Sequence, residues 1–124
     1  MKNKYGENTT TLWTDKKRIL GMPISFTRYS LVASPEWVKV FVKAGFLSTS
    51  IEEVNLYRVY DIKINQSLGQ KMFGVGTITL FSNDVTTPLT EIINVKDPYK
   101  VRNMLAEYIE EAREAKGVRI GEVY

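Results

Sequence analysis

The sequence of 124 residues contains no cysteine and no histidine. Without thiols the chain has no disulfide framework, no thiolate nucleophile and no cysteine ligand for zinc or an iron–sulfur cluster. Without imidazole it lacks the usual general base near neutral pH, and with it any serine–histidine–aspartate triad. These two absences argue against an enzyme, and we expect no catalytic residue, no metal site and no cofactor.

Long hydrophobic runs are also missing. The most apolar stretch, Trp37 to Leu47, is interrupted by Lys39 and Lys43. The polar residues 1–8 are followed by no apolar run. The pattern therefore predicts neither a membrane-spanning helix nor a secretory signal, and we expect a soluble, cytoplasmic chain.

Charge is present but not concentrated. Lysine and arginine number 17 against 14 aspartates and glutamates, which gives a net charge of +3. Residues 1–63 carry ten basic and six acidic side chains, whereas residues 64–124 carry seven and eight. This is far from the dense basic stripe typical of a nucleic-acid-binding protein, so no nucleic-acid partner is expected.

Alternating apolar and polar residues predict a β-rich domain. The length suits a single domain, and period-two segments start at Thr11. The predicted strands after the first cover residues 24–32, 37–43, 47–54, 56–64, 75–81 and 89–95. Val59 falls out of phase within its strand, which predicts a β-bulge, and the glycine-bounded segment 66–74 has room for one helical turn.

The last part of the chain changes to a helical period. Asp97 is a suitable N-cap, Pro98 a suitable first helical residue and Gly117 a suitable stop. Between them runs an apolar stripe at helical spacing, formed by Val101, Met104, Leu105, Tyr108, Ile109, Ala112 and Ala115. A single amphipathic helix must bury its stripe against the sheet, so six or seven antiparallel strands form a curled sheet or barrel whose one opening the helix covers.

Two segments carry a resemblance to a known family. They are the run KRILGMPISFTRYSL from Lys17 to Leu31, and Gln66-Ser67-Leu68 followed by Gly74-Val75-Gly76. Together with Asp97-Pro98 and the helix, they resemble bacterial pleckstrin-homology-like (PH-like) domains, a former group of unknown function. The resemblance covers about residues 11–116.

The resemblance implies a PH-like barrel: about seven antiparallel strands in two nearly orthogonal sheets, with the C-terminal amphipathic helix over one open end. Residues 1–10 are then a flexible N-terminal tail, 11–116 the domain and 117–124 a C-terminal tail. It implies no catalytic residues and little about the ligand, because this scaffold hosts lipid, peptide and protein binding.

The strand at 37–43 suggests a protein-contact face. Val38, Val40 and Val42 share one side, which leaves the other side to Trp37, Lys39, Phe41 and Lys43. If the valines face the interior, the aromatic pair faces outward, as an interface strand does. The pattern predicts a non-catalytic module that binds a protein or assembles into a homo-oligomer.

A basic rim is the alternative site. Lys16, Lys17 and Arg18 are consecutive, Arg28 lies one strand away, and Asp15 offsets one charge. Consecutive side chains on a strand point to opposite faces, so the three converge only in a loop. If they converge, the chain is a peripheral binder of an anionic ligand or of an acidic membrane surface.

Two further patterns carry no chemistry. The glycines from Gly69 to Gly76 lack the Gly-Lys-Ser/Thr of a phosphate-binding loop and lead into a strand. Glu52, Glu53, Asp61 and Asp84 are the carboxylates nearest the strands, and no spacing brings two of them together. Both observations agree with a non-catalytic module.

Overall fold

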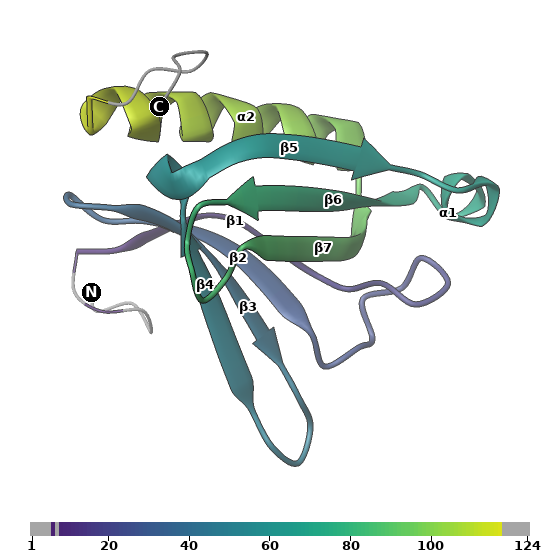
Figure 1. Cartoon of the computed structure of the whole chain (residues 1–124). Coiled ribbons are helices and arrows are strands. Elements are labelled where there is room, and N and C mark those ends of the chain that lie inside the picture. Colours follow the sequence, from purple (N-terminus) through teal and green to yellow (C-terminus); the bar gives the residue numbers. More distant parts are fainter. Residues whose placement is uncertain (1–5, 7, 118–124) are drawn as a thin grey trace.

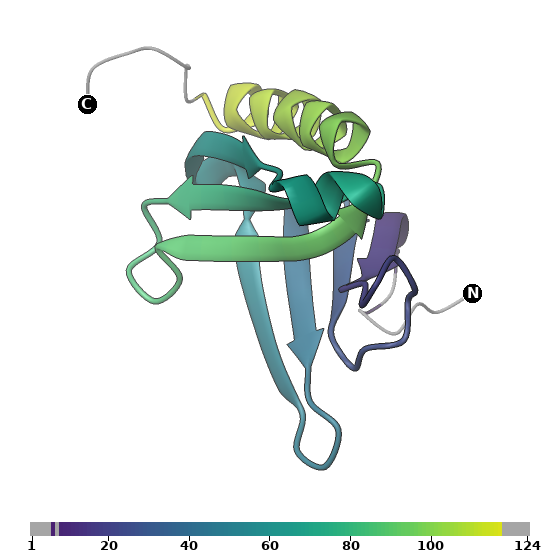
Figure 2. The ribbon, with the colours of Figure 1, turned by 90° about the vertical axis from the view of Figure 1, so that its right-hand side faces the viewer.

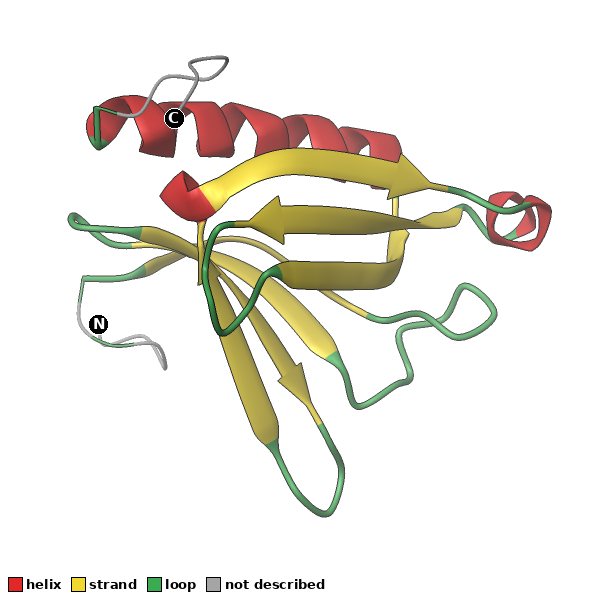
Figure 3. Ribbon diagram, viewed as in Figure 1, coloured by secondary structure: helices red, strands yellow, loops and turns green. Residues whose placement is uncertain are grey.

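The computed structural model describes residue 6 and residues 8–117. Most of the two predicted tails, 1–10 and 117–124, lies outside the described residues. Seven strands form two antiparallel sheets, and a long helix ends the described chain (Figures 1 and 3). The predicted mainly β, PH-like fold is confirmed, with one correction: the sheets do not close into a true barrel.

The first sheet contains four strands in chain order. They are β1 (Thr10–Lys16), β2 (Arg28–Ala33), β3 (Val38–Ala44) and β4 (Ser50–Asn55). Each strand pairs antiparallel with the next, and the predicted strands at 24–32 and 47–54 begin later, at Arg28 and Ser50. Residues 24–27 stay outside the ladder; there the Ser25 hydroxyl donates to the carbonyl of Lys17.

The second sheet follows a short 3-10 turn, η1 (Leu56–Arg58). Its strands are β5 (Val59–Asn65), β6 (Val75–Ser82) and β7 (Leu89–Lys96), and the helical turn α1 (Leu68–Met72) joins the first two. The register shifts between Val59 and Asp61, where the bulge was predicted. Ser67 and Gln70 form a reciprocal capping box, which starts α1.

Helix α2 (Pro98–Ala115) packs across η1, β5 and β6. Asp97 is the N-cap as predicted, but it has a left-handed backbone with φ of 51° and makes no side-chain cap hydrogen bond. Gly117, with φ of 73°, follows the C-cap Lys116 and ends the helix as predicted. Gly76 permits the close approach of α2 to β6, because a Cβ at this position would lie 2.8 Å from Cβ and Cγ of Pro98.

The core lies between the sheets and under α2. Its buried side chains come from every layer: Tyr29, Leu31, Val40, Val54, Leu56, Val59, Ile78, Leu80, Ile92, Val95, Val101, Leu105 and Ile109. Tyr29 also joins the sheets by a hydrogen bond, since its hydroxyl accepts from the backbone N–H of Ile93 at 3.1 Å. Burial is the main reason that the pKa of Tyr29 lies above its ordinary value; the bond from Ile93 lowers it and nearby Glu91 raises it.

Hydrogen bonds from backbone N–H groups link the two sheets at the side where β1 meets β7. At the β1–β7 side, Arg18 N–H donates to the carbonyl of Asn94 at 2.8 Å, and Lys96 N–H donates to Oδ2 of Asp15 at 3.0 Å. At the other side, β4 continues through η1 into β5, but the two strands belong to different sheets and do not pair with each other. The hairpin of β3 and β4 accordingly extends beyond the second sheet (Figure 1).

Candidate binding surfaces

Three cations form one row across the first sheet. Lys16 pairs with Arg28, and Arg28 pairs with Lys43, on the neighbouring strands β1, β2 and β3. The adjacent Tyr29 points into the core, so alternation along β2 places Arg28 and its two cross-strand partners on the outer face. Within residues 8–117, neither ion pair of the structure involves any of these three side chains.

The predicted basic rim is therefore divided. Lys16 and Arg28 come together with Lys43, whereas Arg18 points to Asp15, with Nη2 at 3.2 Å from Oδ1, and donates to the carbonyl of Gly21 at 3.0 Å. Lys17 extends the pairing of β1 with β2, because its N–H donates to the carbonyl of Thr27. Of the four residues expected to bind an anion, the structure brings two into the row and adds Lys43 from the other predicted surface.

The loop between β1 and β2, residues 17–27, exposes apolar side chains. Its tip is a tight turn in which Ile19 pairs with Met22, and both intervening residues have positive φ: Leu20 with 53° and Gly21 with 81°. A left-handed backbone is ordinary for glycine but costs a leucine about 1–2 kcal/mol. The exposed side chains are Ile19, Leu20, Met22, Ile24 and Phe26, with Leu20 66% exposed.

Two neighbouring segments extend this apolar surface. In the turn between β3 and β4, residues 45–49, Phe46 is 70% and Leu47 93% exposed, and the rings of Phe46 and Phe26 lie 4.6 Å apart. Next to α1, Phe73 lies under the tip of loop 17–27, within 3.6 Å of the place where a Cβ on Gly21 would be. We call loop 17–27, turn 45–49 and residues 68–73 together the loop end (Figure 2).

The predicted contact face on β3 needs a correction. Phe41 is only 8% exposed, because its ring lies beside Trp37, 6.1 Å between centroids, and between the neighbouring strands. Lys39 places Nζ 4.7 Å from the Trp37 ring and 2.9 Å from Oε1 of Glu53. Phe41 thus lies on the outer side of the sheet, as expected, but it is buried there. Alternation gives the side of the sheet on which a residue lies but not what covers it.

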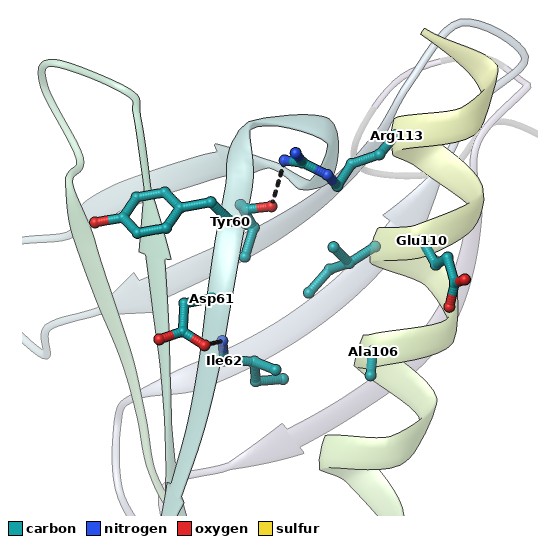
Figure 4. Close-up of a pocket in the computed structure, with 8 residues that line it drawn as sticks. Tyr60, Asp61, Ile62, Ala106, Glu110 and Arg113 are labelled. Carbon is teal, nitrogen blue, oxygen red and sulfur yellow. Dashed lines mark hydrogen bonds between the residues drawn. The ribbon is translucent and has the colours of Figure 1, made fainter. Parts of the chain in front are cut away.

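The free edges of the sheets differ in what occupies them. The β7 edge meets Tyr29, Arg18 and Asp15 as described above. On β5, Arg113 of α2 is buried and donates from Nη1 to the carbonyl of Val59 at 2.9 Å (Figure 4). The outer edge of β4 has no strand beside it in the part of the chain that the structure describes, and residues 50–53 are exposed.

A groove of about 190 Å³ lies between β5 and α2 (Figure 4). Its charged groups are engaged locally: Arg113 holds the β5 carbonyl, and Asp61 accepts from the N–H of Ile62. The only other charged residue in its lining is Glu110. The carboxylate of Glu110 points away from Asp61 (Figure 4), and the described residues contain no cluster of three metal-ligating side chains.

Nothing among the described helices has the length and apolarity needed to span a bilayer. The comparison with curated proteins gives no match, and neither does the comparison with solved structures. A family model described as Bacterial PH domain matches residues 21–109, which is well over half of the chain and includes most of the first segment of the resemblance and all of the second. The chain belongs to the bacterial PH domain family.

Proposed function

We propose that this chain is a non-catalytic docking module that attaches to an anionic membrane surface through its loop end and the adjacent cation row. The observation that carries the proposal is the distribution of exposed apolar residues. Of the fifteen large hydrophobic side chains that are exposed among the described residues, eleven lie in the loop end or next to it on β4. Apolar surface gathered in this way marks an interaction site.

The cation row supplies the preference for negative charge. Like charges directly opposite each other on neighbouring strands repel, so Lys16, Arg28 and Lys43 are electrostatically unfavourable as a set without an anion. Near an anionic membrane each lysine or arginine contributes about 1 kcal/mol of attraction. Phosphate oxygens also accept strong hydrogen bonds from guanidinium and ammonium groups.

The exposed side chains supply the affinity for the bilayer itself. Phe26, Phe46 and Leu47 are large, apolar and exposed, and they lie in the loop just before β2 and the turn just after β3. Aromatic and leucine side chains buried at the boundary of headgroups and acyl chains gain hydrophobic free energy, which adds to the attraction of the basic residues. A non-catalytic role agrees with the lack of histidine and cysteine.

Sedimentation with vesicles tests the proposal. We expect the protein to pellet with vesicles that contain phosphatidylglycerol and to remain in solution with phosphatidylcholine alone. Replacing Lys16, Arg28 and Lys43 together by glutamine should weaken binding by about a hundredfold, given about 1 kcal/mol per charge. The matched control replaces three other cations by glutamine and should bind as wild type. They are Arg58 in η1, Arg102 in α2 and Lys116 at the end of α2.

The apolar part has its own pair of variants. Phe46→Ser with Leu47→Ser should weaken vesicle binding even at high salt. Val85→Ser with Leu89→Ser, in the exposed turn after β6 and at the start of β7, should not. Wild-type protein that stays in solution with anionic vesicles at low salt would refute the proposal. Equal binding by the triple glutamine variant and its control would do the same.

The open edge of β4 favours a second function, self-association. A strand edge with free N–H and C=O groups can pair with another strand. Antiparallel pairing of two copies centred on Ile51 sets this exposed residue against its counterpart and keeps Glu52 and Glu53 away from their own copies. Sedimentation velocity should show a dimer that Ile51→Lys abolishes and Ile51→Val retains; a strict monomer at high concentration excludes it.

A further inference from the structure

A second cationic site lies at the start of α2 and shares only Arg18 with the loop end. A cavity of about 330 Å³ is bounded by β1, the end of β7 and the first turn and a half of α2. Its lining is Trp13, Thr14, Asp15, Arg18, Lys96, Asp97, Lys100, Val101 and Met104. This volume is within the range of small-molecule sites.

One side of the cavity is fixed by Asp15, whose carboxylate is saturated. Oδ1 accepts from the N–H of Lys16 at 2.8 Å, and Oδ2 accepts from the N–H of Lys96 at 3.0 Å. Arg18 donates to the same carboxylate from Nε and to the carbonyl of Gly21 from Nη1. The guanidinium is thus held in place with its side chain 19% exposed, and donor hydrogens remain for an incoming group.

Two lysines complete the positive charge. Lys96 and Lys100 are exposed on either side of Asp97, and none of the hydrogen bonds or ion pairs found in residues 8–117 engages either Nζ atom. Asp97 is the other acid of the lining, and its carboxylate makes no side-chain cap hydrogen bond. With Asp15 already paired to Arg18, the cavity carries a net positive charge.

The rest of the wall is apolar. Trp13 and Met104 are half-buried and pack against the core, and both form part of the lining. An indole favours a flat partner, which it contacts by stacking or edge-to-face packing. Cations at the mouth and an indole in the wall select a ligand that is anionic at one end and aromatic at the other.

We propose that this cavity binds an aryl or nucleoside phosphate, with the phosphate on Arg18, Lys96 and Lys100 and the ring against Trp13. Such a ligand fits the three donors, because phosphate accepts charge-assisted hydrogen bonds from both guanidinium and ammonium groups. The site uses none of the three residues of the cation row.

Tryptophan fluorescence gives a direct readout. The sequence has two tryptophans, so Trp37→Phe leaves Trp13 as the only reporter. We expect phenyl phosphate and adenosine monophosphate, added to millimolar concentration, to change Trp13 emission saturably, and calorimetry on the wild-type chain to give the same affinities. Inorganic phosphate and adenosine alone should bind at least about tenfold more weakly.

Three variants locate the binding. Lys96→Gln with Lys100→Gln should weaken phenyl phosphate by at least about tenfold, and the control Lys63→Gln with Lys116→Gln should leave it unchanged. Asp97→Asn, which suits the left-handed backbone, should tighten binding severalfold. The proposal is overturned if neither organic phosphate alters Trp13 emission or gives heat, if the Lys96 and Lys100 variant binds as wild type, or if inorganic phosphate binds equally well.

Discussion

The two ends of the sheets carry similar apolar side chains in opposite environments. On the side of α2 that faces the sheets, Leu105 is fully buried and Ile109 is 6% exposed. At the loop end, Leu47 is 93% and Phe46 70% exposed. The two ends therefore do not differ in the type of side chain they carry. They differ in whether other parts of the chain cover those side chains. The comparison shows where the chain buries its hydrophobic residues and where it leaves them exposed.

Truncating one leucine at each end gives the largest contrast. Leu105→Ala should lower the free energy of unfolding by about 2–5 kcal/mol, because it removes buried methyl groups and leaves a cavity. Leu47→Ala should change it by less than about 0.5 kcal/mol, since the side chain is already in water. Urea denaturation measures both, and a comparable loss for Leu47→Ala would show that the loop end is covered in solution.

Glycine substitutions sharpen the same contrast. Gly76→Ala should destabilise by about 1–3 kcal/mol, because the added Cβ would lie 2.8 Å from Pro98 and force α2 away from β6. Gly69→Ala in α1 meets nothing within 4 Å and should stabilise by up to about 1 kcal/mol through helix propensity. Thermal unfolding of the two variants tests the pair, and a destabilised Gly69→Ala would contradict it.

Tyr29 couples the two sheets between these ends. Tyr29→Phe removes the bond from Ile93 and should cost about 0.5–1.5 kcal/mol at neutral pH. The raised pKa means that the folded state keeps the phenolic proton after the unfolded chain has lost it. The stabilisation is therefore complete below about pH 10 and is lost as the pH rises through the folded pKa. Denaturation curves should show a smaller alkaline loss for Tyr29→Phe than for wild type.

Substitution of Leu20 should have the smallest effect on stability, and its effects on stability and on binding should have opposite signs. Leu20→Gly should raise the free energy of unfolding by at most about 1 kcal/mol, because glycine accepts the positive φ but loses more chain entropy on folding. The same variant removes an exposed apolar side chain and should weaken vesicle binding. Unchanged binding would mean that the strained leucine has no part in docking.

Much of the fold could be predicted from the sequence because its signals are local. The alternation in 37–43, the bulge near Val59 and the helix from Asp97 to Gly117 depend on neighbouring residues only. The row of Lys16, Arg28 and Lys43 could not be predicted, since it depends on the register of three strands and on the late start of β2. The burial of Phe41 depends on which side chains pack over the sheet. The alternation of apolar and polar residues along one strand carries no information about that packing.

The open edge of β4 bears on how this chain can aggregate. The edges of β5 and β7 meet side chains of the chain's own fold over part of their length. Two copies joined through β4 use this edge in both partners, so this contact closes as a pair instead of growing into a fibril. Glu52 and Glu53 on this edge further oppose irregular stacking of strands. A concentrated solution should therefore contain monomers and dimers without ordered polymers.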